Sequence, residues 1–579
     1  MNTKIILKPC PKGYSKDLDK ATPPEHTVAK VKEVLANWGQ EILAELKRID
    51  TGRLGIPVYM SICGPKARGV MPTRKQMGKG ASPAQAQASA LMELVERFSF
   101  FNFVQDEKRF RFLTWSEAEK SLGSKLLPVQ EILHSVQEQM PPSNARQILD
   151  LVQWKFTSAT EIDTEKECYL PFDWFKKLNE FNGSSAGNTA EESILQGACE
   201  LIERHTCAII DEQRLIRPTI DPDTFSDPIL KELYLKFKKQ GIKVWLKDFS
   251  LDMPAPTVGA VAYDPKTFPA SSEIVFTAGT ATSPHKAAIR ALTEIAQLAG
   301  DFESGSNYEA SGLSKFTSLD QIHWLTQGEK IALDKLPSLE DDDIYLELKK
   351  LCNRLASLGF RLYSISTSHP ELGIATHYNI IPGFRFRERT KNASLGLFVG
   401  RIIAEEEEPQ LALKKLDTLA EIYPQSYFIP FFKGLAFLRL NKLELAADHF
   451  AKSEPLQPDN EEKGLAAFYY AYTLTQAGRW SEALPHLDRA IALSPDVKEY
   501  YNLRGVALFK QKEFEQAAKN FQEALNLDQG SAVDLANLGL CYKFLGQKEK
   551  AIELLSEALK LEPNLDFANK QLNELLDLS

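Results

Sequence analysis

The sequence predicts an α+β domain followed by an all-α repeat domain. Over residues 1–391, helix-like segments with apolar residues three or four apart alternate with short strand-like runs. Over residues 392–579, small and aromatic residues recur about every 34 positions, which is typical of stacked helical pairs. We therefore expect two domains, 1–391 and 392–579, with the chemistry in the first.

The expected elements of the first domain follow from apolar periodicity and from start signals. Asn188 and Thr189 are candidate N-terminal caps for one of the helices. The expected helices are Thr27–Lys47, Pro83–Phe101, Thr189–Asp211 and Pro284–Phe302, and the expected strands are Pro57–Cys63, Val258–Tyr263, Glu273–Ala278 and His377–Pro382. Pro382-Gly383 marks the last turn before the domain boundary.

The repeats are defined by small residues followed at fixed distances by alanine and by a large apolar residue. The small positions are Gly400, Gly434, Ala471, Gly505 and Gly539. They resemble tetratricopeptide repeats, and we expect about five. The acidic run 405–408 falls between the helices of the first repeat, so a solvated turn is favoured over an interaction tail. The resemblance implies a surface for a protein partner or a second copy of the chain, so we expect a homodimer.

Composition and charge exclude several classes of protein. The 579 residues are 43% hydrophobic and 25% charged, with a net charge of −9, so nothing points to nucleic acid or an anionic membrane as the main partner. Seven cysteines without a C-x-x-C pair argue against a disulfide framework or a zinc ribbon. The first residues lack the apolar core of a signal peptide. We expect a cytoplasmic protein that neither binds nucleic acid directly nor enters a membrane.

Three of the expected helices carry polar residues on one narrow stripe. At 100° per residue, Glu192, Gln196, Glu200 and Glu203 fall within about 80° of one another. No Lys or Arg lies between Gly183 and Glu203. The two further stripes are Ser89, Glu93 and Glu96 on one helix and Arg290, Glu294 and Gln297 on another.

Carboxylates crowded together without cations repel one another. Two of them 4 to 5 Å apart repel by roughly 3 to 4 kcal/mol at an effective dielectric constant of about 20. Oxygen ligands without His or Cys suit Mg²⁺, which commonly shares its shell with carboxylates and nucleotide phosphates. A solvated helix face explains one such stripe, but three stripes favour a cation site.

The three stripes and their surroundings resemble the nucleotide-binding motifs of the YcaO family. The resemblance rests on SALMELVER (89–97), on the polar spacing from Ser185 to Arg204, and on Arg290, Glu294 and Gln297. KATPPEHT (20–27), MGKGAS (77–82) and IIPG (380–383) extend it over about 1–390. It implies a fold that binds ATP without a Walker loop, and no G-x-x-x-x-G-K-[ST] occurs in the chain.

The resemblance assigns residues to ATP and Mg²⁺. Arg290 and Glu294 would act in catalysis, and Lys20 and Lys79 are candidates to reach the phosphates, with solvent exposure as the alternative. The implied Mg²⁺ ligands are Glu93, Glu96, Glu200 and Glu203, and the implied nucleotide-binding residues are Lys79, Ser89, Arg97, Ser185, Asn188, Glu192, Gln196, Arg204, Arg290, Glu294 and Gln297.

The implied chemistry is activation of a peptide or protein amide. The amide oxygen takes the γ-phosphate of ATP, and a Cys, Ser or Thr side chain or external sulfide then attacks the carbon. The combination of this domain with repeats resembles members linked to thiolation or methylthiolation of proteins, including a ribosomal protein, and this implies a sulfur-transfer or methylthiolation partner. Azoline-forming members usually end in a Pro-rich tail, whereas this chain ends in NELLDLS. Azoline cyclodehydration therefore stays an alternative, as does a non-catalytic ATP-binding scaffold that recruits a ribosomal-protein methylthiolation enzyme.

Overall fold

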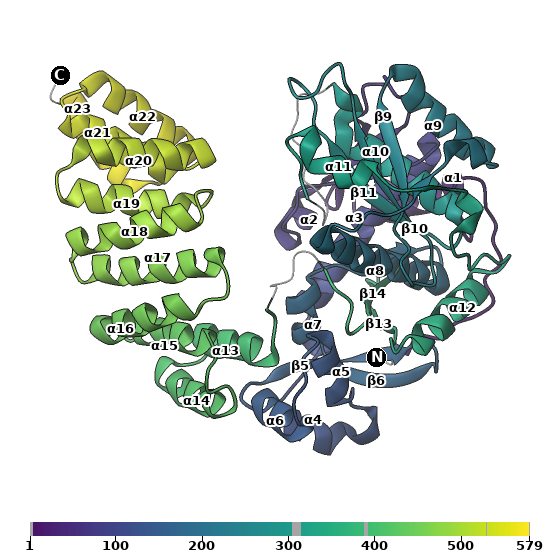
Figure 1. Ribbon diagram of the computed structural model, residues 1–579, viewed down its shortest axis with the longest axis horizontal. Coiled ribbons are helices and arrows are strands. Elements are labelled where there is room, and N and C mark those ends of the chain that lie inside the picture. The colour runs from purple at the N-terminus through teal and green to yellow at the C-terminus, as the bar shows by residue number, and fades with distance from the viewer. Residues whose placement is uncertain (1–3, 304–313, 387–391, 529, 578–579) are drawn as a thin grey trace. The chain divides into compact units, whose positions relative to one another are not determined.

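The computed structural model describes residues 4–303, 314–386, 392–528 and 530–577. The chain separates into two compact units (Figure 1). The first comprises residues 1–142 and 153–391, and the second comprises 143–152 and 392–579. The short segment 143–152, which carries most of α6 (Pro142–Leu149), groups with the repeats, and no pattern in the sequence indicated this.

The described part of the first unit contains three sheets. One is antiparallel, in the order β1 (Leu43–Arg48), β2 (Val58–Cys63) and β3 (Lys75–Lys79). The second runs β11 (Val275–Thr280), β10 (Thr257–Tyr263), β9 (Lys243–Asp248), β8 (Thr219–Ile220) and β12 (Lys330–Ile331), with only β8 and β12 parallel. The third runs β4 (Arg111–Leu113), β5 (Trp154–Glu161), β13 (Tyr363–Ser366), β14 (Ala375–Ile380) and β7 (Ser184–Gly187), with β6 (Lys166–Pro171) also paired to β5.

In each sheet, one strand is followed along the chain by a short link and a long helix. Helix α3 (Pro83–Gln105) follows β3, α8 (Ala190–Gln213) follows β7, and α10 (Pro284–Ala299) follows β11. Each helix packs back on the strand that precedes it. The Ser82 and Thr189 side chains cap α3 and α8 by accepting the backbone N–H groups of residues 85 and 192. The same strand–helix unit therefore occurs three times, with a side-chain cap at α3 and α8 and none from Ser283 at α10.

A glycine in each of these strands lets the helix approach closely. A Cβ atom on Gly78 would lie 2.0 Å from the Ala90 nitrogen, and one on Gly279 would lie 2.5 Å from the Ala291 nitrogen. A Cβ atom on Gly187 would lie 2.4 Å from the Ser193 nitrogen. Because real Cβ atoms do not come this near to backbone atoms, a larger residue would push the helix off its strand.

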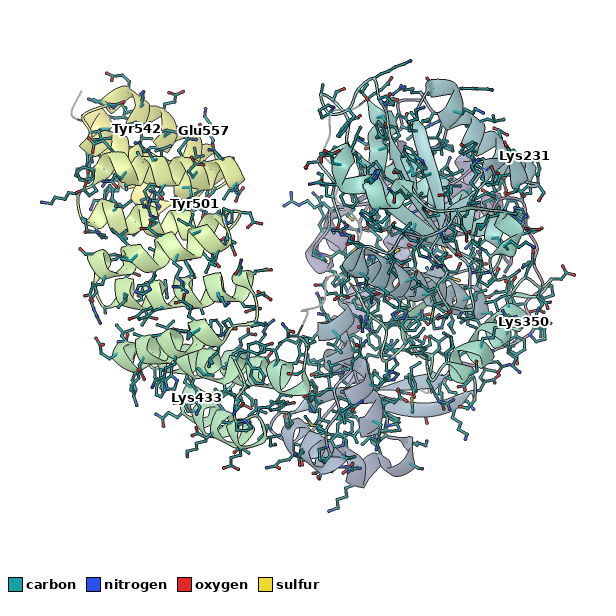
Figure 2. The ribbon with its side chains drawn as sticks, in the orientation of Figure 1. Lys231, Lys350, Lys433, Tyr501, Tyr542 and Glu557 are labelled. Atoms are coloured by element: carbon teal, nitrogen blue, oxygen red, sulfur yellow. The ribbon has the colours of Figure 1, made fainter. Side chains whose placement is uncertain are left out.

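The remaining helices of the first unit pack on the sheets or on the three long helices. Their apolar faces are buried, and their outer faces carry charged side chains such as Lys231 (Figure 2). They are α1 (Pro24–Ala36), α2 (Pro65–Val70), α4 (Trp115–Leu122), α5 (Val129–Ser135), α7 (Phe172–Asn179), α9 (Pro228–Gln240), α11 (His323–Thr326) and α12 (Ile344–Ser357).

One of the predicted helices, Thr27–Lys47, is wrong in its second half. Helix α1 ends at Ala36, and Gly39 adopts a positive φ of 57° in the turn that follows. Residues 43–48 then form β1, which pairs with β2. The apolar spacing from Ile42 to Leu46 fits a helix as well as a strand, and pairing with β2 decides between them. The predicted helix at 284 also ends earlier, at Ala299, because Gly300 enters the left-handed region at φ 50°.

Besides most of α6, the second unit contains five helix pairs and a final helix among its described residues (Figure 1). The predicted all-α repeat domain is confirmed, although the third repeat is offset by three residues where a 3₁₀ turn, Glu454–Leu456, follows α16. The helices are α13 (Leu395–Glu406), α14 (Pro409–Ile422), α15 (Phe428–Arg439), α16 (Leu443–Ser453), α17 (Asn460–Gln476), α18 (Trp480–Leu493), α19 (Lys498–Lys510), α20 (Phe514–Leu527), α21 (Ala532–Phe544), α22 (Lys548–Leu561) and α23 (Asp566–Asp577).

The recurring small residues bring the two helices of a pair together. A Cβ atom on Gly434 would lie 2.7 Å from the Phe450 ring, and one on Gly505 would lie 2.8 Å from the Phe521 ring. Glu408, the last residue of the acidic run, caps α14 by accepting the backbone N–H groups of Gln410 and Leu411. Glu405 and Glu406 end α13, so only Glu407 and Glu408 lie in the predicted turn.

No helix in the described residues is both long and apolar enough to cross a membrane.

Candidate functional site

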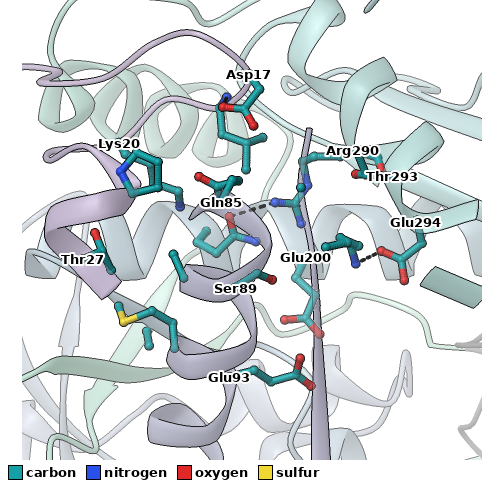
Figure 3. Close-up of a pocket in the computed structure, with 18 of the residues that line it drawn as sticks. Asp17, Lys20, Thr27, Gln85, Ser89, Glu93, Glu200, Arg290, Thr293 and Glu294 are labelled. Atoms are coloured by element: carbon teal, nitrogen blue, oxygen red, sulfur yellow. Dashed lines mark hydrogen bonds and ion pairs between the residues drawn. The ribbon is translucent and has the colours of Figure 1, made fainter. Parts of the chain in front are cut away.

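The three polar stripes line one cavity in the first unit (Figure 3). Its volume is about 310 Å³, and its walls come from α3, α8, α10 and the N-terminal segment (residues 4–23) with the start of α1. Seven carboxylates and five basic side chains face it. The lining residues that the sequence singled out are Lys20, Lys79, Ser89, Glu93, Glu96, Arg97, Asn188, Glu192, Gln196, Glu200, Glu203, Arg204, Arg290, Glu294 and Gln297.

Ser185 is the predicted site residue that the structure does not bring to the cavity. Its hydroxyl lies beneath α8, where it accepts a hydrogen bond from the Asn379 side chain at 3.0 Å. Its carbonyl accepts the Ser193 hydroxyl, also at 3.0 Å. In this structure the Ser185 side chain holds β7 against α8 and β14.

The four glutamates predicted to bind Mg²⁺ gather where α3 and α8 come together, and Figure 3 shows the carboxylates of Glu93 and Glu200 turned toward each other. The arginine that follows each pair along the chain forms an ion pair there. Arg97 lies 3.0 Å from Glu96, and Arg204 lies 3.9 Å from Glu200. The E-x-x-E-R motif, which occurs on both α3 and α8, therefore gives each helix two acidic groups and one adjoining cation.

These cations do not offset the cost of burying the carboxylates. Burial raises the pKa values of Glu93 and Glu203, and it raises the pKa of Glu96 to about 8 although Arg97 opposes the change. Burial and the charge of Arg290 lower the pKa of Lys79 to about 8. The site therefore favours the arrival of a further cation at the glutamates and of an anion at the basic groups.

The donor set fits Mg²⁺ bound together with phosphate oxygens. Among the residues that the structure describes, no group of three His, Cys, Asp or Glu side chains is placed to hold a metal ion by itself. Mg²⁺ is usually held by one or two carboxylates, with waters and substrate phosphates filling the other positions. Two buried polar atoms on α10, Arg290 Nε and Gln297 Oε1, have no hydrogen-bond partner. The glutamates and these atoms therefore suit a ligand that carries both a cation and negatively charged oxygens.

The N-terminal segment closes the other end of the cavity. Glu192 Oε2 accepts the Ala21 backbone N–H at 2.8 Å, and Lys20 Nζ lies 3.6 Å from Glu192 Oε1. The Thr27 hydroxyl donates to the Asn188 side chain at 3.0 Å. The KATPPEHT stretch (20–27) is thus joined to the start of α8, which explains why these two distant motifs occur together.

Two contacts tie α10 to its neighbours across the cavity. Arg290 Nη1 donates to Gln196 Oε1 at 3.1 Å, as the dashed line in Figure 3 shows. Lys79, at the end of β3, forms an ion pair with Glu294. The candidate catalytic residues Arg290 and Glu294 therefore each hold a partner from another wall of the cavity.

Several lining residues were missed from the sequence. Gln85 lies four residues before Ser89, so the stripe on α3 could have been extended back by one step. Thr293 lies between Arg290 and Glu294 on α10. Asp17 lies in an irregular segment without periodicity, so no pattern could have indicated it.

Three comparisons with known proteins bear on the family and the fold of the chain. Residues 77–385, more than half of the chain, match the model of the YcaO family, described as a YcaO cyclodehydratase that binds ATP and Mg²⁺. Residues 471–532 and 532–565 match tetratricopeptide-repeat models. The chain belongs to the YcaO family, an ATP- and Mg²⁺-binding family, and carries tetratricopeptide repeats after the YcaO domain.

Individual relatives match parts of the chain. An uncharacterized protein of Methanothermobacter thermautotrophicus is 27% identical over 380 residues, which is 63% of this chain and 94% of the relative. The Escherichia coli K12 ribosomal protein S12 methylthiotransferase accessory factor YcaO is 28% identical over 212 residues, 32% of this chain and 35% of the relative. The structure of YcaO from Methanopyrus kandleri, bound with AMPPCP and Mg²⁺, has a TM-score of 0.50 and 21% identity, covering 65% of this chain and 94% of that one. This likeness supports the same fold.

Proposed function

We propose that the chain uses MgATP to activate a backbone amide of a peptide or protein for thiolation. The observation that carries this proposal is one cavity lined by seven carboxylates and five basic groups. A family of ATP- and Mg²⁺-binding proteins supplies the context. We assign Mg²⁺ to Glu93, Glu96, Glu200 and Glu203.

The residues of the cavity would act mainly by positioning and by charge neutralisation. Bound Mg²⁺ supplies neutralisation of the phosphate charge and of the glutamates. Arg290 offers a planar guanidinium that grips two phosphate oxygens at once, and Gln196 fixes its orientation. Glu294 holds Lys79 at the cavity wall, where the ammonium group can meet a phosphate oxygen. These groups would hold the γ-phosphate for attack by the amide oxygen.

The proposed reaction then exchanges oxygen for sulfur. The amide oxygen forms a bond to the γ-phosphorus as the bond from that phosphorus to the leaving nucleotide breaks. Sulfide attacks the activated carbon, and phosphate departs with the former amide oxygen. The product is a thioamide, and the electron count of the carbon is unchanged.

A second candidate is a scaffold that binds ATP and recruits a methylthiolation enzyme through its repeats. The observation that favours it is the relative named as an accessory factor of ribosomal protein S12 methylthiotransferase. Tetratricopeptide repeats favour protein partners in general. In this reading the YcaO domain binds nucleotide without modifying an amide.

Mass spectrometry of the proteome with and without the gene separates these functions. If the chain thiolates, proteins from cells with the gene carry sulfur in place of oxygen at a backbone amide. If it forms azolines, they lack one water. If it is a scaffold, a methylthio group present in cells with the gene is missing from cells without it. As a control, the gene is restored with the substitution Glu203→Gln. The modification should stay absent if it needs the nucleotide site, and it should return if it does not. If no modification depends on the gene, the proposal is wrong.

A further inference from the structure

Residues 11–20 of the N-terminal segment form a hairpin that covers part of the cavity. Its two arms are joined by two backbone hydrogen bonds between Tyr14 and Lys20, at 3.0 and 2.9 Å. Asp17 and Lys20 line the cavity, and Figure 3 shows both beside it. Lys16, in the same hairpin, is exposed. The hairpin therefore has the cavity on one side and solvent on the other.

Apolar packing anchors the hairpin at its base but not along its length. The anchors belong to one hydrophobic cluster and are Ile5, Leu7 and Cys10 before the hairpin and Ala21 after it. Between them, the sequence PKGYSKDLDK contributes little apolar surface. Asp17 is the only buried residue among 11–20, all of which the structure describes. Because few apolar contacts hold it, the hairpin can separate from the domain at a low cost in free energy while its base stays in place.

Two lysines hold the hairpin in its present position through polar contacts. Lys286, near the start of α10 and only 6% exposed, donates to the backbone carbonyl of Ser15 at 2.7 Å and to that of Lys16. Lys12 Nζ lies 2.7 Å from a carboxylate oxygen of Glu347 on α12. Hydrogen bonds to a charged group are stronger than those between neutral groups. The middle of the hairpin therefore depends on Lys286, and its first arm depends on Lys12.

A second, smaller cavity lies between the hairpin and the elements that it contacts. Its volume is about 50 Å³, and it is lined by Leu18, Asp19 and Lys20 of the hairpin and by residues of α8, β11, α10 and α12. A single water needs roughly 10–15 Å³, so this cavity has room for more than one. The hairpin is therefore incompletely packed against the domain, and moving it away breaks few van der Waals contacts.

We propose that residues 11–20 are a lid over the nucleotide site and that Lys286 is the positioning residue that holds the lid closed. This inference rests on the proposed MgATP site. Lys286 lines the small cavity and is not among the described residues that line the large one. It therefore acts on the nucleotide through the lid. Nucleotide enters and leaves while the lid is open, so the strength of the Lys286 contacts sets how fast it does so.

The test is the rate at which MgATP binds to and leaves the immobilised full chain, measured by surface plasmon resonance. Lys286→Met removes the donor but keeps an unbranched side chain, and we expect the association and dissociation rate constants to rise together, each about tenfold. Lys286→Arg still donates to the carbonyls and should stay near the wild type. Lys231→Met, at an exposed residue of α9, is the matched control. If Lys286→Met leaves the association rate constant unchanged, Lys286 holds no lid and the proposal is overturned.

Hydrogen exchange of the full chain tests the lid without nucleotide. The Lys12 and Ala21 N–H groups, at the two ends of the hairpin, donate to acceptors outside it, and opening breaks these hydrogen bonds. In the wild type, amides of residues 12–21 should exchange faster than those of 5–10, and Lys286→Met should accelerate them about tenfold further. Equal exchange in the two segments of the wild type would overturn the proposal even if the variant does not fold. A wild-type chain that binds no MgATP refutes the proposed function, and this experiment still tests the lid.

Discussion

The two units of the chain differ in the sequence separation between the residues that contact one another. In the repeats, each core position recurs along the sequence, and Gly505 meets Phe521 only sixteen residues away. In the YcaO domain, the cavity joins residues as far apart as Lys20, Glu93 and Glu294. A substitution in one repeat should therefore affect mainly that repeat and its neighbours, whereas a single substitution in the cavity affects residues from every wall.

The largest effect is expected from the core of one repeat. Phe521 on α20 is 1% exposed, so Phe521→Ala leaves a cavity and should lower the free energy of unfolding of the second unit by about 3–5 kcal/mol. Urea unfolding followed by circular dichroism measures this change. Leu527→Ala, on the same helix but 45% exposed, should lower it far less. MgATP affinity should be unchanged in both variants, and a parallel loss of affinity would show that the comparison between the units fails.

Removing a charge from the acidic end of the cavity should weaken nucleotide binding. In Glu203→Gln, we expect MgATP affinity or turnover to fall at least tenfold, about 1.4 kcal/mol or more, because one of the assigned Mg²⁺ ligands is lost. Glu93→Gln should act in the same way from α3. Glu232→Gln, on the exposed face of α9, is the control. Wild-type affinity in both cavity variants would remove these glutamates from the site.

Activity should be more sensitive to substitution of Arg290 than the loss or retention of its charge alone suggests. Arg290→Lys keeps one positive charge but loses the planar guanidinium that can bind two oxygens and Gln196 together. Phosphate transfer from ATP should fall about tenfold, while the midpoint of thermal unfolding stays close to that of the wild type. An active Arg290→Lys variant would place Arg290 away from the phosphates.

The smallest effect concerns stability in acid. Burial lowers the pKa of His377 to about 3, so the imidazole is neutral in the folded chain and takes up a proton on unfolding below about pH 6.5. This contribution to the free energy of unfolding is present above that pH and is lost as the pH falls, by about 1.4 kcal/mol at pH 5.5. Urea unfolding of wild type and His377→Gln at pH 7.5 and 5.5 tests this. The variant should lose less stability than wild type, and exposed His26→Gln should behave as wild type does.

These differences explain how much could be predicted from the sequence. The helix pairs, and the stripes on α3, α8 and α10, were predictable because a helix places residues three and four apart on one face. The position of Ser185 was not, because its contact with Asn379 depends on the pairing of β7 with β14. Asp17 and the change from α1 to β1 likewise depend on contacts with distant segments. Local periodicity therefore predicted the helices and most of the cavity, and long-range pairing determined the rest.

The most direct test of the Mg²⁺–ATP site is the dependence of ATP binding on Mg²⁺. Seven carboxylates line a cavity that also has to admit a triphosphate, so the two should repel each other unless Mg²⁺ lies between them. Calorimetry of the full chain with ATP should show binding in the presence of Mg²⁺ and at least tenfold weaker binding in EDTA. Equal ATP affinity under the two conditions would contradict the assignment of Glu93, Glu96, Glu200 and Glu203 as Mg²⁺ ligands.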